Sequence, residues 1–204
     1  GSGSAGGVVA ARLSEVAEWR VLLLEAGGPP PPESVVPAYN VVLQDADTDW
    51  KYKMTSPFPM GRVLGGTSVL NSLEYVRGNR RDYDNWEAMG NPGWRYKDVL
   101  KYFKKAEDYR GTRNVDTAAE YHGRGGPLKV EDKRYSAPVT SGFLKAGQQL
   151  GYSIIDPSGP EQIGFSIPET TTQDGRRVST AEAYVKPAAT ALNLHVAFNA
   201  HVTQ

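Results

Sequence analysis

Apolar residues follow two different spacings near the start of the chain, and each spacing predicts one kind of element. In residues 8–15 they recur at helical spacing without proline, directly after a glycine-rich opening that we interpret as a loop. Residues 19–25 then form a short continuous apolar run that ends in a carboxylate. Such a run is typical of a strand buried on both faces of a parallel sheet, so we expect an α/β fold.

Turn-forming residues separate the elements expected further along the chain. Prolines 29–32 predict an extended connector, and no regular pattern follows up to residue 59. The expected elements are helices at 82–89, 97–106, 138–150 and 179–189, a long surface loop at 108–127, a strand pair or loop at 167–172, and a half-exposed strand at 194–202.

The composition excludes several classes of function. The 23 basic residues balance the 23 acidic ones, so no basic field indicates nucleic acid as a partner. Cysteine is absent, which excludes a disulfide framework, a thiolate metal site and a catalytic thiol. No apolar stretch approaches the roughly 20 residues that span a bilayer. Chemistry on a small molecule therefore stays open, and the cellular compartment stays unknown.

The opening of the chain matches the dinucleotide-binding pattern G-x-G-x-x-G through Gly1, Gly3 and Gly6. In this pattern the first glycine makes a tight turn, the second lets backbone approach a pyrophosphate, and the third lets a helix pack on a strand. The helix that follows offers N-terminal amides to a phosphate, and Glu25 can accept hydroxyl protons from an adenosine ribose. A glycine turn before an ordinary helix is the alternative. Because the motif normally follows a strand, we expect a segment before Gly1.

Residues 61–71 form a second glycine-rich stretch, GRVLGGTSVLN. Its paired glycines permit close approach of the backbone, and Thr67, Ser68 and Asn71 add two hydroxyls and an amide. These groups suit a pyrophosphate or the edge of a flavin ring. A glycine turn inside the fold explains them equally well.

Together these motifs resemble the glucose-methanol-choline oxidoreductase family. The resemblance rests on residues 1–6, 24–27, 61–71, 75–78 and 174–187, which occur in the order typical of the family. Residues 77–86 and 121–123 are most similar to the insect glucose dehydrogenase branch. The motifs are spread along the whole chain, so the resemblance is specific.

The resemblance implies an FAD-dependent oxidoreductase that acts on the CH–OH group of an alcohol or sugar and transfers hydride to the flavin. It assigns the pyrophosphate to Gly1, Gly3 and Ser4, the ribose to Glu25, the adenine to Val202, and the pyrophosphate and flavin to Arg62, Gly65, Gly66, Thr67, Ser68 and Asn71. Leu70 occupies the place where some members attach flavin through a histidine, so we expect non-covalent FAD. The catalytic histidine of the family lies far downstream of residue 204. No catalytic residue is therefore expected in this chain.

The implied architecture is a Rossmann-type FAD-binding domain interrupted by excursions, plus the start of a substrate-binding lobe. We expect residues 1–130 to form the first part of the FAD-binding domain, with a lid-like loop at about 39–60. Residues 131–168 begin the substrate-binding lobe, and residues 169–204 return to the FAD-binding domain.

The expected partners are a small-molecule alcohol and an electron acceptor, either a quinone or oxygen, with no nucleic acid and no membrane span. Resemblance to the insect proteins implies secretion, but the localisation is otherwise unknown. Two alternatives stay open. The first alternative is an NAD-dependent Rossmann dehydrogenase, since residues 1–25 would serve NAD as well. The second alternative is a non-catalytic dinucleotide-binding remnant.

Some residues suggest catalysis or metal binding, but their context favours ordinary roles. His122, His195 and His201 are expected on the surface or in hydrogen bonds rather than as bases or ligands. Residues 45–49 resemble the start of a calcium loop, but the glycine at its sixth place and the carboxylate at its twelfth are missing. We therefore expect no metal site.

A small basic cluster lies at Arg77, Arg80 and Arg81. Such a cluster can attract an anionic electron acceptor. Asp82 and Asp84 lie beside it in the sequence, so we expect these charges to pair locally.

Overall fold

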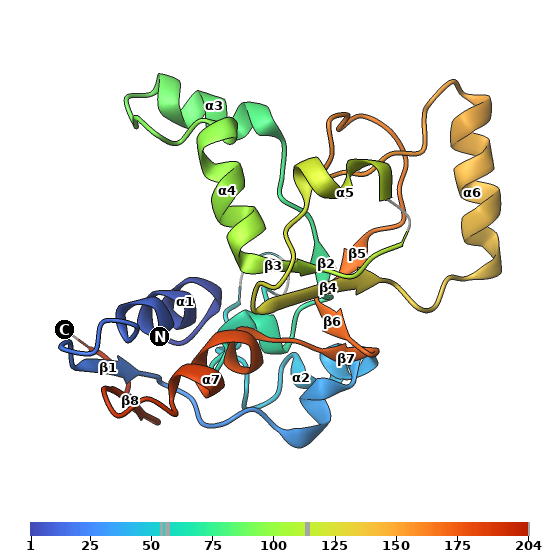
Figure 1. Ribbon diagram of the computed structural model, residues 1–204. Coiled ribbons are helices and arrows are strands. Elements are labelled where there is room, and N and C mark those ends of the chain that lie inside the picture. The colour runs from blue at the N-terminus through green and yellow to red at the C-terminus, as the bar shows by residue number, and fades with distance from the viewer. Residues whose placement is uncertain (54, 56–57, 113–114, 204) are drawn as a thin grey trace. The chain divides into compact units, whose positions relative to one another are not determined.

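The computed structural model describes residues 1–53, 55, 58–112 and 115–203 (Figure 1). The chain forms two compact units, one made of Gly1–Leu73 with Thr172–Gln204 and the other of Glu74–Thr171. Helices and strands occur in both units, which confirms the predicted α/β class. The functional domain boundaries at residues 130 and 168 stay predictions.

The first unit contains a parallel strand pair and an antiparallel hairpin. Its strands are β1 (Val21–Leu24), β6 (Thr172–Gln173), β7 (Arg176–Arg177) and β8 (Leu194–Ala197). Its helices and helical turns are α1 (Ser4–Leu13), η1 (Pro32–Val35), η2 (Pro37–Tyr39), α2 (Asn40–Leu43), η3 (Gly66–Val69), η4 (Ala181–Val185) and α7 (Lys186–Ala188). In the parallel pair β1–β8, Val21 lies opposite Leu194, while β6 and β7 form the hairpin.

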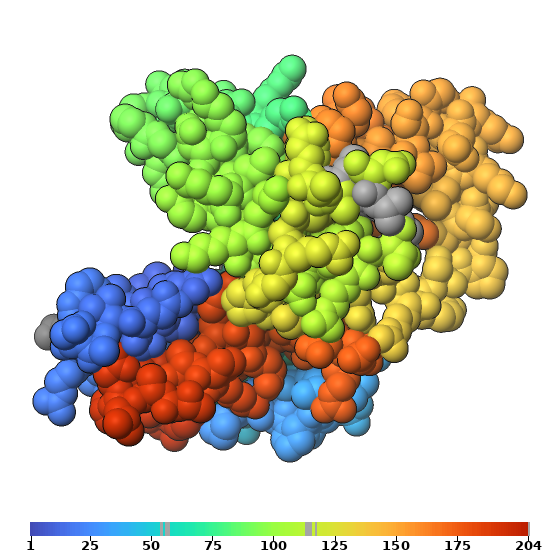
Figure 2. Space-filling view, viewed as in Figure 1, coloured from blue at the N-terminus to red at the C-terminus, as the bar shows by residue number. Residues whose placement is uncertain are grey.

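The core of the first unit lies where α1 packs against β1 and η4. It contains Ala10, Leu23, Leu64, Ala181, Val185 and Leu194. Small residues on the buried face of α1 permit this packing: a Cβ added at Gly7 would lie 2.5 Å from Cγ2 of Thr180. In the space-filling view, α1 (blue) and the C-terminal elements (red) lie directly against each other (Figure 2).

Three details of the first unit differ from the prediction. Helix α1 begins at Ser4 rather than at residue 8, because burial against η4 outweighs the low helix propensity of Gly6 and Gly7. Leu22 of β1 is 63% exposed, so within the described residues this strand is not buried on both faces. Strand β8 ends at Ala197 rather than at residue 202.

The second unit is built around a four-stranded mixed sheet of order β2-β5-β4-β3. Its strands are β2 (Glu74–Tyr75), β3 (Glu107–Tyr109), β4 (Leu128–Asp132) and β5 (Glu169–Thr170), and its helices are α3 (Arg80–Ala88), α4 (Tyr96–Ala106), α5 (Val115–Tyr121) and α6 (Pro138–Gln149). Helices α3, α4 and α6 confirm three predicted helices. The predicted surface loop at 108–127 is wrong, because this segment contains most of β3 and all of α5.

A buried polar network explains why part of that segment lies in the interior. Nη2 of Arg77 donates to Glu107 at 2.7 Å, and His122 contacts both Glu107 and Asp156 at 2.9 Å. The ring of Tyr109 stacks on the imidazole of His122 at a centroid distance of 3.9 Å. His122 thus has a buried, hydrogen-bonded role. The predicted pairing of Arg77 with its neighbouring aspartates is wrong, because its side chain reaches the more deeply buried Glu107.

The contacts of His122 determine its charge. Burial alone lowers the pKa of the imidazole, but hydrogen bonds to the Asp156 and Glu107 carboxylates raise the pKa of His122 to about 9. The ring is therefore protonated at neutral pH, and the network links an imidazolium and a guanidinium to two carboxylates.

No helix in the described part of the chain is long and apolar enough to cross a bilayer.

Candidate functional site

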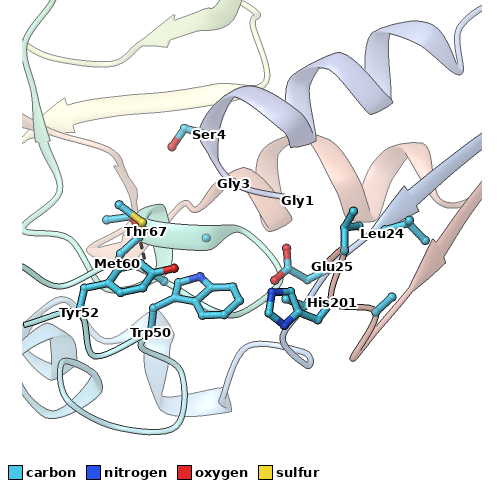
Figure 3. Close-up of a pocket in the computed structure, with 15 residues that line it drawn as sticks. Gly1, Gly3, Ser4, Leu24, Glu25, Trp50, Tyr52, Met60, Thr67 and His201 are labelled. Atoms are coloured by element: carbon cyan, nitrogen blue, oxygen red, sulfur yellow. Dashed lines mark hydrogen bonds between the residues drawn. The ribbon is translucent and has the colours of Figure 1, made fainter. Parts of the chain in front are cut away.

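The two glycine-rich stretches meet backbone to backbone in the first unit (Figure 3). Gly66 has a φ of +55°, and a Cβ built on it would lie 2.6 Å from the Cα of Gly3. The amide of the adjacent Gly65 donates to Oγ of Ser2 at 3.1 Å. A side chain at Gly66 would therefore push the two stretches apart, and the backbone conformation there also favours glycine.

Glu25 fastens this meeting point to the end of strand β1. Its side chain is buried, with Oε2 accepting from the amide of Ser2 at 2.8 Å and from Oγ of Ser2 at 2.6 Å. Oε1 accepts from the amide of Gly27 at 2.9 Å. Ser2 therefore links Glu25 to both glycine-rich stretches. The role of Ser2 was not predicted from the sequence, because the G-x-G-x-x-G pattern leaves its position unspecified.

The glycines of the opening motif serve different purposes in the structure. A Cβ at Gly6 would lie 2.0 Å from the carbonyl oxygen of Gly1, so the fold itself requires glycine there. At Gly3 the nearest atom, Cα of Gly66, is 3.9 Å away. The protein therefore has room for a methyl group at Gly3. A requirement for glycine at that position would have to come from a ligand.

The N-terminus of α1 adds donors to this site. Its N-cap residue is Gly3, no side chain caps it, and no acidic residue lies in its first turn. The first amides of a helix have no partner within the helix, and the helix dipole places partial positive charge there. The end of α1 is thus suited to an anionic group.

A pocket of about 470 Å³ opens beside the meeting point. This volume lies in the range usual for small-molecule sites. Seven of the eleven residues predicted to bind the cofactor line it: Gly1, Gly3, Ser4, Glu25, Gly66, Thr67 and Val202. The other four, Arg62, Gly65, Ser68 and Asn71, are not among its lining residues.

Aromatic side chains form one wall of the pocket (Figure 3). The ring of Trp50 lies 5.2 Å from His201 in an edge arrangement and stacks on Tyr52 at 5.9 Å. The guanidinium of Arg62 lies over Trp50, 5.7 Å from its ring centroid. Of these residues, only Arg62 was assigned to the cofactor from the sequence, while Trp50 and Tyr52 lie in the predicted lid-like loop. The proposed lid role of residues 39–60 stays a prediction.

Asp49 has a local structural role at the edge of this wall. Its carboxylate accepts from the amides of Asp45, Lys51 and Met60 at 3.0, 3.1 and 2.9 Å. Burial alone raises the pKa of Asp49, but these hydrogen bonds lower that pKa below its usual value. Among the described residues, no group of three or more His, Cys, Asp or Glu side chains is arranged to hold a metal ion.

Comparison with known proteins identifies similar sequences and folds. The family model described as GMC oxidoreductase matches residues 3–204. The whole chain is 46% identical to glucose dehydrogenase [FAD, quinone] of Drosophila melanogaster and 36% identical to ecdysone oxidase of Bombyx mori, covering 34% and 33% of those proteins. The chain therefore spans about a third of the length of these relatives.

A solved structure agrees with the fold. The crystal structure of pyridoxine 4-oxidase from Mesorbium loti superposes with a TM-score of 0.90 at 32% identity, over 98% of this chain and 41% of that one. This likeness confirms the predicted fold class.

Proposed function

Because the chain belongs to the GMC oxidoreductase family, we propose that it forms part of an FAD-dependent enzyme that oxidises the CH–OH group of an alcohol or sugar. The meeting of Gly3 and Gly66 beside the N-terminus of α1 supports this most directly. There the backbones of Gly3 and Gly66 approach each other without intervening side chains, and the amides at the N-terminus of α1 are suited to bind an anion. This arrangement fits the pyrophosphate of a dinucleotide.

The other groups of the pocket fit the adenosine half of FAD. Oε1 of Glu25 accepts only the amide of Gly27 among the described residues, which leaves a lone pair for a ribose hydroxyl. Val202 and the aromatic wall offer apolar surface for an adenine ring. We place the pyrophosphate at Gly1, Gly3 and Ser4, and the remainder of the cofactor along residues 62–71.

We propose that FAD is held without a covalent bond. Leu70 is fully buried in an apolar cluster with Leu43, Val63 and Val69. An aliphatic side chain in this position has no nucleophile with which to attach a flavin. The cofactor should therefore be released when the protein is denatured.

When bound, FAD supplies the hydride-accepting chemistry. The residues of this chain bind it, orient it and exclude water from it, and we assign none of them to proton transfer. His122, whose pKa is raised, belongs to the second unit's buried network and is held between Glu107 and Asp156.

The names of the relatives indicate the range of substrates and acceptors to test. They include a glucose dehydrogenase named for FAD and quinone, an ecdysone oxidase and an oxygen-dependent choline dehydrogenase. Each is an oxidoreductase named for a small molecule. We propose an alcohol or sugar as donor and either a quinone or oxygen as acceptor.

Anaerobic mixing of the complete protein with a panel of sugars, sterols and small alcohols tests the proposal. A substrate should bleach the visible absorption of the flavin, and adding a quinone or oxygen should restore it. An alcohol-dependent reduction of added NAD, with no change in flavin absorption, would instead support the nicotinamide-dependent alternative. The second glycine-rich stretch, for which a simple NAD-binding unit has no use, argues against that outcome.

A further inference from the structure

Arg177 of β7 is a buried charge that has no counter-ion among the described residues. Arg177 is 3% exposed, and among the described residues it forms no ion pair. Arg77, which is buried to the same degree, pairs with Glu107. Since burial of an unpaired charge is costly, the presence of an arginine at position 177 requires an explanation.

The guanidinium of Arg177 donates only to neutral oxygens. Nε donates to the carbonyl of Ser34 at 3.0 Å, and Nη1 donates to the carbonyl of Ser68 at 3.1 Å and to Oδ1 of Asn71 at 2.8 Å. Nη2 has no partner among the described residues. Without a compensating anion, burial lowers the pKa of Arg177 to about 10, and the group stays charged at neutral pH.

These contacts determine how the amide of Asn71 is oriented. Oδ1 of Asn71 accepts from both Arg177 and the amide of Leu73, the latter at 3.1 Å. Its two lone pairs are therefore occupied. Nδ2 of Asn71 makes no hydrogen bond within the described part of the chain, so it remains a free donor on the other side of the amide.

Residues 177–180 also hold the second glycine-rich stretch through hydrogen bonds to Ser68. Oγ of Ser68 donates to the carbonyl of Gly65 at 2.6 Å and accepts from the amide of Thr180 at 2.9 Å. Arg177 therefore holds the backbone carbonyl of Ser68, and Thr180 holds its side chain. Two donors, Nη2 of Arg177 and Nδ2 of Asn71, are left without acceptors, as expected where a ligand rich in acceptor atoms completes a site.

We propose that Arg177 is a positioning residue for FAD: it holds the amide of Asn71 so that Nδ2 donates to the cofactor. This inference rests on the proposed function, since it requires FAD to lie along the second glycine-rich stretch. An arginine suits the role because one planar fork reaches Ser34, Ser68 and Asn71 together.

A double-mutant cycle on the complete protein tests this role. FAD affinity is measured by flavin fluorescence for the unaltered protein, Asn71→Ala, Arg177→Met and the double variant. Each single change should weaken FAD binding about tenfold, as for loss of one hydrogen bond that involves a charged group. Because Arg177 acts through Asn71, the double variant should bind no more weakly than Asn71→Ala alone. Arg176→Met, which alters the exposed neighbour in β7, should leave the affinity unchanged.

The outcomes separate this inference from the proposed function. If the losses of the two single variants add in the double variant, Arg177 stabilises the fold independently of Asn71 and the inference is overturned. If the unaltered protein does not bind FAD, the proposed function fails as well. Should circular dichroism show that Arg177→Met is unfolded, Arg177→Lys replaces it in the cycle. The lysine keeps the charge but cannot reach all three oxygens, so the same coupling to Asn71 is expected and additive losses again overturn the role.

Discussion

Oγ of Ser2 donates to Oε2 of Glu25 at 2.6 Å, so the first glycine-rich stretch is tied to the end of strand β1. The same hydroxyl accepts from the amide of Gly65. One side chain therefore joins three segments that are far apart in sequence.

We predict that Ser2→Ala destabilises the protein by about 1–3 kcal/mol, because a buried amide and a buried carboxylate each lose a partner. Chemical denaturation measures this change in the free energy of unfolding. Ser4→Ala, which alters an exposed hydroxyl at the first residue of α1, is the matched control and should change this free energy little. Equal effects of the two substitutions would contradict the joining role of Ser2.

Gly3→Val should abolish FAD binding because its side chain would occupy the space assigned to the pyrophosphate. The folded protein has room for a Cβ at this position, so Gly3→Ala should change thermal stability little. Gly6→Ala should behave oppositely and lower stability, because its Cβ meets the carbonyl of Gly1. Gly28→Ala, with no atom within 4 Å of the added Cβ, should affect neither property. Unchanged FAD affinity in Gly3→Val would remove the pyrophosphate from this position.

Glu25→Ala should weaken ligands that contain adenosine, including FAD and ADP, because the ribose loses its acceptor. Binding of riboflavin, which lacks the adenosine, should not respond to the carboxylate. Titration of the variant with FAD, ADP and riboflavin compares the three. Because Glu25 also accepts from Ser2 and Gly27, the variant should unfold at a lower temperature. An equal loss of affinity for FAD and riboflavin would indicate a general disruption of the site.

The stability provided by His122 should fall as the pH rises. Its pKa is raised from 6.5 to about 9 in the folded protein, so protonation stabilises the fold fully below about pH 6.5. That contribution is lost as the pH rises through about 9. The difference in thermal stability between the unaltered protein and His122→Gln should therefore shrink over this range. Parallel curves for the two proteins would show that the imidazolium does not contribute.

Sequence patterns located the elements whose burial follows a simple period. Residues 19–25 contain β1, and residues 97–106 cover all of α4 except its first residue, Tyr96. The segment 108–127 was misassigned because its polar composition suggested a surface. Tyr109 and His122 are in fact buried there. Their burial is favourable only because of contacts with residues distant in sequence, such as the hydrogen bond between His122 and Asp156.

In the candidate site, too, some residues could be predicted from the sequence and others could not. The glycines and Glu25 could be identified because a motif specifies their chemistry. Ser2 and Arg177 could not, since their roles depend on which carbonyls and carboxylates the fold brings near them. Trp50 and His201 are likewise far apart in sequence, and only the folded chain brings their rings to 5.2 Å.

Identification of the bound cofactor tests the central claim most directly. The complete protein is purified, its visible absorption and fluorescence are recorded, and it is then precipitated with acid. We predict a flavin spectrum that passes entirely into the supernatant, with the released compound identified as FAD. A colourless protein that cannot be reconstituted with FAD would contradict the assignment of the two glycine-rich stretches to this cofactor.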